Sequence, residues 1–120
     1  MSAEELLFDA LTADAGVTAL VGTRIYPELV PQEQEPPCVA YSRAGTEYVM
    51  TIHSGVPAAQ IATLEMVCMA RTQEAANQVA DAVELAAGAA NFVLSGRSSV
   101  PPDVDLNGLR GTTLTVTKFT

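Results

Sequence analysis

The stretch of this sequence that comes nearest to a chemical site is a run of short polar side chains near the C-terminus. Asp103, Asp105 and Asn107 stand at alternate positions and are followed by Gly108. This is the pattern of the first half of a calcium-binding loop. The second half does not follow, because its twelfth position is Leu114, where a bidentate carboxylate is needed. The pattern therefore favours a polar hairpin turn over a calcium site.

Nucleophilic catalysis would have to use His53, the only histidine, and its neighbour Ser54. Two adjacent residues cannot form a triad without a distant acid, and the sequence has no GxSxG nucleophile elbow. It also has no phosphate-binding glycine loop with a lysine, no HExxH motif and no carboxylate pair that its spacing brings together. We therefore predict that the protein is not an enzyme and that it uses no cofactor or metal.

Cys38 and Cys68 each lie inside a strand-like run. Free cysteine behaves as a small hydrophobic residue in protein cores, so the first interpretation is that both thiols are reduced and buried. A disulfide between them is the alternative. The sequence has no CxxC pair and no cysteine-histidine spacing that would suit zinc.

The composition is that of a small acidic domain. With 120 residues, 48% of them hydrophobic, residues 1–120 are expected to form a single domain with one core. Six basic residues against fourteen acidic ones give a net charge of -8, which would repel phosphate backbones and argues against a free-standing nucleic-acid binder. The sequence has no signal-peptide pattern and no apolar run of membrane-spanning length, so we expect a soluble protein made in a cytoplasm.

The chain is organised around a strand over Gln60–Ala70 and a helix over Thr72–Ala87. One face of this strand is apolar at period two and consists of Ala62, Leu64, Met66, Cys68 and Ala70. The helix carries one apolar stripe at three-and-four spacing, made of Ala76, Val79, Ala80, Val83 and Ala86. Thr72 suits the N-cap, and Gly88 can close the last turn. The helix is therefore expected to pack across the strand.

A short N-terminal helical segment precedes this unit. Ser2 and Glu5 form a capping box at the start of a helix that we expect to run to Thr12. Asp14 can cap a second short helix that ends at Gly22. The predicted fold class is α+β: an antiparallel sheet with one long helix packed across it and a short N-terminal helical segment.

The strand over Gln60–Ala70 is predicted to pair with a strand over Cys38–Ala44, across a long connection from Gly45 to Ala59. This connection is rich in apolar residues, which in a long loop usually contact another part of the structure. The loop can fold back on its own core, or another subunit can bury it. For the second case the candidate interface residues are Tyr48, Val49, Met50, Ile52 and Met69.

The C-terminal third predicts a hairpin. An edge strand is expected near Ser98–Val104, because Pro101-Pro102 would interrupt a central one. Asn107-Gly108 is a strong turn signal. It leads into a last strand over Leu109–Phe119, in which Leu114 and Val116 face inward and the intervening threonines face outward.

The order of these features resembles the tail completion proteins of long-tailed bacteriophages, also called tail terminator or head-to-tail joining proteins. In the first part of the chain the resemblance rests on Leu11-Thr12-Ala13-Asp14-Ala15-Gly16-Val17, Leu20-Val21-Gly22 and Arg24-Ile25-Tyr26-Pro27. In the rest it rests on Pro36-Pro37, Val39-Ala40-Tyr41, Val67-Cys68-Met69-Ala70 and the helix from Glu74-Ala75 to Ala80-Asp81-Ala82-Val83. It covers nearly the whole chain, but the last strand stops early at Thr120 and lacks an aromatic-rich end.

The resemblance implies a structural virion protein without catalysis. Such a protein forms a homo-oligomeric ring, usually a hexamer, that caps the head-proximal end of the tail tube and stops its polymerisation. Its partners would be itself, the tail tube protein and the head connector or neck protein, with assembly in the host cytoplasm and no contact with a membrane. DNA would pass through the lumen without specific binding, which an acidic lumen would favour because it repels phosphates.

Two other functions compete with this one. The first is a monomeric or dimeric α+β adaptor module that binds a partner without catalysis, and oligomeric state separates it from a ring. The second is a small hydrolase, for which His53 and Ser54 are the only support. A broad activity screen would reveal the hydrolase.

Overall fold

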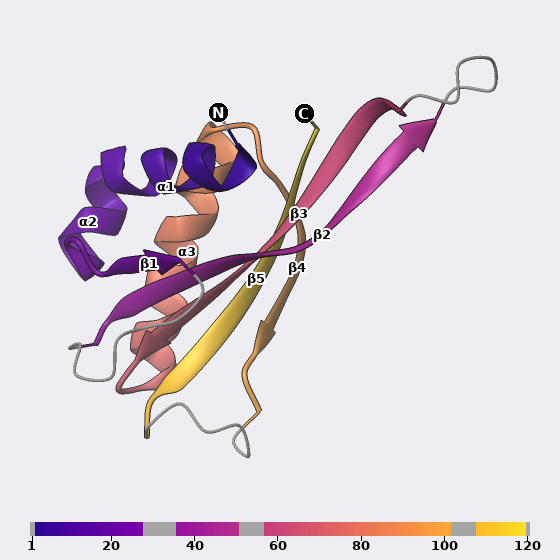
Figure 1. Ribbon diagram of the computed structural model, residues 1–120. Coiled ribbons are helices and arrows are strands. Elements are labelled where there is room, and N and C mark those ends of the chain that lie inside the picture. The colour runs from indigo at the N-terminus through magenta and orange to yellow at the C-terminus, as the bar shows by residue number, and fades with distance from the viewer. Residues whose placement is uncertain (1, 28–35, 51–56, 102–107, 120) are drawn as a thin grey trace.

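The computed structural model describes residues 2–27, 36–50, 57–101 and 108–119. Its helices are α1 (Ala3–Ala13), α2 (Ala15–Val21) and α3 (Gln73–Ala89). Its strands are β1 (Ile25–Pro27), β2 (Cys38–Met50), β3 (Pro57–Ala70), β4 (Val93–Ser99) and β5 (Arg110–Phe119). The strands form one sheet in the order β1-β2-β3-β5-β4, and the helices lie together on one side of it (Figure 1).

The predicted α+β class is confirmed, with one addition to the sheet. The pairs β2-β3 and β4-β5 are antiparallel as expected, and β5 also pairs antiparallel with β3. The short strand β1 pairs in parallel with β2, where Ile25 lies opposite Val39. β1 thus adds a parallel edge to the sheet.

The main core lies between α3 and the centre of the sheet, as the two periodicities predicted. Every apolar residue of the β3 face is at most 1% exposed, and Leu64, Met66 and Cys68 are completely buried. The apolar stripe of α3 is buried against them, together with Leu114 and Val116 of β5. The two N-terminal helices close the core with four residues that are fully buried: Leu7, Leu11, Val17 and Val21.

The helix starts are capped by the side chains that the sequence indicated. Ser2 Oγ accepts a hydrogen bond from the Glu5 amide at 3.2 Å, and Asp14 Oδ1 accepts one from the Val17 amide at 3.0 Å. Thr72 Oγ1 accepts one from the Ala75 amide at 3.1 Å. Each cap satisfies a backbone donor that the first turn of a helix leaves free.

The end of α3 differs from the prediction that Gly88 closes it. The helix continues through Gly88 to Ala89, and the residue with a left-handed backbone is Asn91, at φ 67°. Asparagine tolerates this conformation better than most residues. The later turn brings Phe92 back onto the core, where it is 4% exposed.

The predicted connection from Gly45 to Ala59 is largely strand. β2 continues to Met50 and β3 begins at Pro57, with Tyr48 opposite Gln60. A shift in register lies between Arg43 and Gly45. An extra residue in one strand reverses which positions face the core, so the period-two pattern of β2 is broken where the prediction ended the strand.

The edge strand also lies earlier than predicted. β4 spans Val93–Ser99 rather than a segment near Ser98–Val104. A register shift between Leu94 and Gly96 interrupts the alternation of inward and outward residues by which a strand is recognised in a sequence. Its predicted place at the edge of the sheet is confirmed. β5 agrees with the predicted last strand, and its inward and outward positions are as expected.

Candidate functional site and assembly surfaces

The residues that could do chemistry do not form a site in the described part of the chain. His53, Ser54 and the polar run Asp103 to Asn107 lie outside the described residues, while Gly108 takes a left-handed φ of 82°, as a turn residue does. Within residues 2–27, 36–50, 57–101 and 108–119, no group of three or more histidine, cysteine or acidic side chains could hold a metal ion.

Both cysteines are free and buried, which confirms the first interpretation. They lie on neighbouring strands but on opposite faces of the sheet, because Cys68 pairs with Val39 and Cys38 pairs with Met69. Burial raises the pKa of the Cys38 thiol, and it raises the pKa of the Cys68 thiol to about 12. Both thiols are therefore protonated at neutral pH and unreactive.

The first candidate surface is a two-stranded projection that we call the arm, formed by residues 46–50 of β2 and 57–60 of β3. β1 pairs only with residues 39–41 of β2, and the pairing of β5 with β3 stops at Ile61. Beyond these points β2 and β3 pair only with each other, and they extend past the helices (Figure 1). An isolated two-stranded hairpin is at best marginally stable in water, so the arm gains stability from any surface that covers it.

The predicted interface residues are divided between this arm and the body. Tyr48 lies on the arm and is 56% exposed, and the backbone of Val49 and Met50 continues the same strand. Ile52 lies outside the described residues. Met69 is at the other end of β3 and is 8% exposed, in a small cluster with Cys38 and Ala40 on the face of the sheet opposite the helices.

The second candidate surface is a hollow between the C-terminal end of α3 and β4, which sequence reasoning did not find. We call it the α3–β4 hollow; its volume is about 400 Å³. Its lining consists of Glu84, Leu85, Ala87, Gly88, Ala89, Phe92, Leu94 and Val116. Leu85 is 76% exposed, since it lies off the buried stripe of α3, and Leu94 is 37% exposed. The one signal for this hollow in the sequence was Leu85, an apolar residue outside the apolar stripe of α3. Single exposed apolar residues are too common to identify a site.

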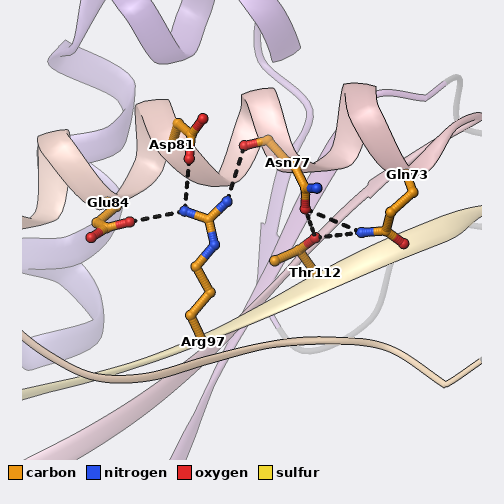
Figure 2. Close-up of polar contacts among 6 residues, drawn as sticks. All are labelled: Gln73, Asn77, Asp81, Glu84, Arg97 and Thr112. Atoms are coloured by element: carbon orange, nitrogen blue, oxygen red, sulfur yellow. Dashed lines mark hydrogen bonds and ion pairs between the residues drawn. The ribbon is translucent and has the colours of Figure 1, made fainter.

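Beside this hollow, one arginine forms ion pairs with two acidic residues (Figure 2). Arg97 of β4 donates from Nη1 to Asp81 Oδ1 at 2.7 Å and to Glu84 Oε2 at 3.0 Å, and from Nη2 to the Asn77 carbonyl at 3.4 Å. The hydrogen bond to Asp81 is the main reason that the pKa of Arg97 is raised. The guanidinium thus links the edge strand to α3 and offsets one of the two negative charges.

A second polar cluster fixes the other half of α3 on β5. Thr112 is 2% exposed; its hydroxyl donates to Asn77 Oδ1 at 2.7 Å and accepts from Gln73 Nε2 at 2.9 Å (Figure 2). Buried polar groups are stable when they are paired in this way. This cluster positions the helix that forms one wall of the hollow.

Comparison with known proteins supplies the family. The sequence profile of the tail completion protein gp17 family matches residues 5–118. The chain belongs to this family. This confirms the resemblance drawn from the residues, and it makes the chain a structural virion tail protein of bacteriophage type, a class that is generally not enzymatic. Among curated proteins, no sequence matches the chain significantly.

A solved structure agrees on the fold of this tail completion family member. A chain described as belonging to the virion of a native gene transfer agent (GTA) particle is similar, with a TM-score of 0.64 and 19% sequence identity. The match covers 98% of this chain and 93% of that one. At this identity the likeness establishes a shared fold.

The face of the sheet away from the helices is polar in its middle. Thr113, Thr115 and Thr117 of β5 lie there with Thr63 and Glu65 of β3, all at least partly exposed. An antiparallel sheet can leave one such face in water. In the described helices, no segment is long and apolar enough to span a membrane.

Proposed function

We propose that this tail protein is a terminator. Copies of the chain would assemble into a closed ring, with six subunits by the family resemblance, that caps the head-proximal end of the tail tube. The ring would end tube polymerisation and join the tail to the head connector, with residues 1–120 of each subunit acting as one domain. Family membership over residues 5–118 supports this proposal. The feature of the chain that carries it is the uncovered arm.

The arm has the composition of a surface that another protein covers. Among residues 45–61 the only charged residue is Glu47, although the whole chain carries twenty charged side chains. The cores of protein interfaces are depleted in charge and enriched in tyrosine and methionine. We propose Tyr48, Val49, Met50 and Ile52 as its contact residues, in contact with a neighbouring subunit.

A ring explains how a subunit can end a polymer. When each subunit contacts the next through two different surfaces, the chain of contacts either closes on itself or continues without limit. A closed ring leaves no lateral surface free, which fixes its number of subunits, and tube growth stops if the outer face of the ring does not bind another tube subunit. The remaining faces are then available to the tail tube protein and to the connector or neck protein.

DNA would pass through the ring without specific binding. The net charge of -8 and the exposed Glu65 on the polar sheet face are consistent with a lumen that repels phosphates. A lumen lined by the arginines and the lysine, with the acidic residues on the outer rim, would contradict this part of the proposal. Electron microscopy of capped tubes would locate both sets of residues.

The decisive experiment measures the mass of the assembled protein and its ability to cap tail tubes. Light scattering after size exclusion, over a range of concentrations, should give a closed multimer near six subunits. Purified tail tubes mixed with the protein should stop growing and carry one ring at one end in electron micrographs. A protein that stays monomeric or dimeric and leaves tube growth unchanged would favour the adaptor function instead.

A further inference from the structure

We propose that the α3–β4 hollow of one subunit receives Tyr48 from the arm of the next subunit, an inference that rests on the self-assembly proposed above. The occupant is thus a second copy of this chain. The contact joins two different surfaces, so it is heterologous and can repeat around a ring.

The exposed apolar residues of the described chain support this pairing. Five large apolar side chains are exposed: Phe8, Tyr48, Leu85, Val93 and Leu94. Leu85 of α3 and Leu94 of β4 line the hollow, whereas Val93 lies on the other face of the sheet with Thr117. Phe8 already contacts the ring of Tyr41, with 6.2 Å between the ring centroids. Tyr48 is left as the exposed aromatic side chain without an aromatic neighbour among the described residues, and the hollow offers it a mostly apolar lining.

Charge favours contact at these two places over the rest of the surface. Two copies with a net charge of -8 repel each other, so they approach best where their surfaces are neutral. Beside the hollow, the single positive charge of Arg97 pairs with both Asp81 and Glu84, which leaves one net negative charge on this group. On the arm, Glu47 is the single charge. The arm and the hollow therefore each carry only about one net negative charge on a molecule whose net charge is -8.

The backbone adds a second, independent observation. β4 is the last strand of the sheet, and among the described residues only β5 pairs with it. Residues 46–50 of β2 likewise lack a partner on their outer side, because β1 reaches only to Tyr41. Free strand edges favour pairing with another strand. A strand added beside β4 would direct every second side chain to the α3 side of the sheet, next to Leu94, where the hollow lies.

Cross-linking of two single variants tests this contact. Tyr48→Cys and Leu85→Cys are purified separately and then mixed, and a short bis-maleimide is added with and without tail tubes. The native thiols are buried, and the wild-type protein checks that they do not react. We expect a covalent dimer in the mixture and no dimer from either variant alone. The double variant should give a ladder of products that ends at the ring size.

The matched control places the cysteine on another exposed apolar residue, in Phe8→Cys on α1. Mixed with Tyr48→Cys, it should give less than a tenth of the product. A dimer from Tyr48→Cys alone, equal product with Phe8→Cys, or no product in the mixture under either condition would overturn the proposal. Capping of tubes by the wild-type protein is scored separately. If capping occurs without the cross-link, the terminator function stands and this inference fails. If the cross-link forms without capping, the contact between the arm and the hollow stands and the terminator function fails.

Discussion

The body and the arm of this protein share two strands but differ in what covers them. Between Ala62 and Ala70, β3 lies under α3, and the residues of its inner face are buried. Between residues 57 and 60 the same strand pairs only with β2. The body is therefore stabilised by its own core, whereas we infer that the arm depends on a partner. Substitutions in the body should change the free energy of unfolding, and substitutions on the arm should change assembly.

The largest expected loss of stability follows from Leu64→Ala. Leu64 is fully buried at the centre of the core, so its truncation removes apolar contacts and leaves a cavity. We expect the free energy of unfolding to fall by about 2–5 kcal/mol. Urea unfolding followed by far-ultraviolet circular dichroism measures this loss. The comparison between body and arm would be wrong if Tyr48→Ala cost as much.

Alkaline pH should weaken the body through Cys68. The pKa of this thiol is about 12 in the folded protein, because burial disfavours the thiolate, against a usual value of 9.0. Above pH 9 the unfolded chain loses this proton while the folded chain keeps it, so stability falls as pH rises. The expected slope is roughly 1.4 kcal/mol per pH unit between pH 9 and 12.

The variant Cys68→Val isolates this effect. The pKa values of Cys38 and Tyr41 are also raised by burial, so the wild-type protein loses stability from several groups. Unfolding curves at pH 8, 9.5 and 10.5 should show a shallower decline for Cys68→Val. Parallel declines for the two proteins would mean that Cys68 ionises as easily when folded as when unfolded.

A smaller loss is expected from Thr112→Val. The substitution keeps the shape of the side chain but removes a buried hydroxyl, which leaves Asn77 Oδ1 and one Gln73 N–H without this partner. The expected cost is about 1–3 kcal/mol of unfolding free energy. Thermal unfolding measures it, and Thr112→Ser serves as the control that retains the hydroxyl. If Thr112→Val lost no stability, the hydroxyl would contribute nothing, and the loss in Thr112→Ser would give the contribution of the methyl group alone.

The smallest effect on stability, with the largest effect on assembly, is expected from Tyr48→Asp. The side chain is more than half exposed, so the free energy of unfolding should change by less than about 0.5 kcal/mol. A carboxylate on the arm cannot enter an apolar surface without a desolvation cost, so the multimer should dissociate. Light scattering and circular dichroism on one sample measure both quantities.

Tyr48→Phe is the matched control for this variant, since it keeps the aromatic ring and should keep the multimer. An unfolded Tyr48→Asp monomer would show that the arm folds against its own subunit. In that case the division between a self-stabilised body and a partner-dependent arm would not hold.

The sequence predicts the fold correctly where a single local pattern determines the structure. The alternation in β3, the stripe of α3 and the caps at Ser2, Asp14 and Thr72 involve residues a few positions apart, and all of them are found in the structure. The misplaced elements are those with an irregularity. Register shifts after Arg43 and after Leu94 break the period of two, so the alternation of the sequence predicts neither the second half of β2 nor the position of β4.

The candidate surfaces were predictable to different degrees. A stretch that begins at Tyr48 and is apolar and uncharged was visible in the sequence, and composition alone marks it as a segment that needs cover. The α3–β4 hollow was not visible, since it forms only where the end of a helix meets an edge strand. Arg97 could not be assigned to Asp81 either, because the two residues are 16 positions apart and meet only through the packing of β4 beside α3.

By itself, the sequence determined the α+β class, the packing of α3 on β3 and the family, because periodicity, capping and the order of structural residues are local signals. The tertiary structure decided that the residues around Tyr48 form a projecting arm, that Asn77 and Thr112 meet across 35 positions, and that a mostly apolar hollow lies at the end of α3. These features depend on strand register and on the approach of distant segments. Both are set by the packing of the whole core, which no short window of sequence contains.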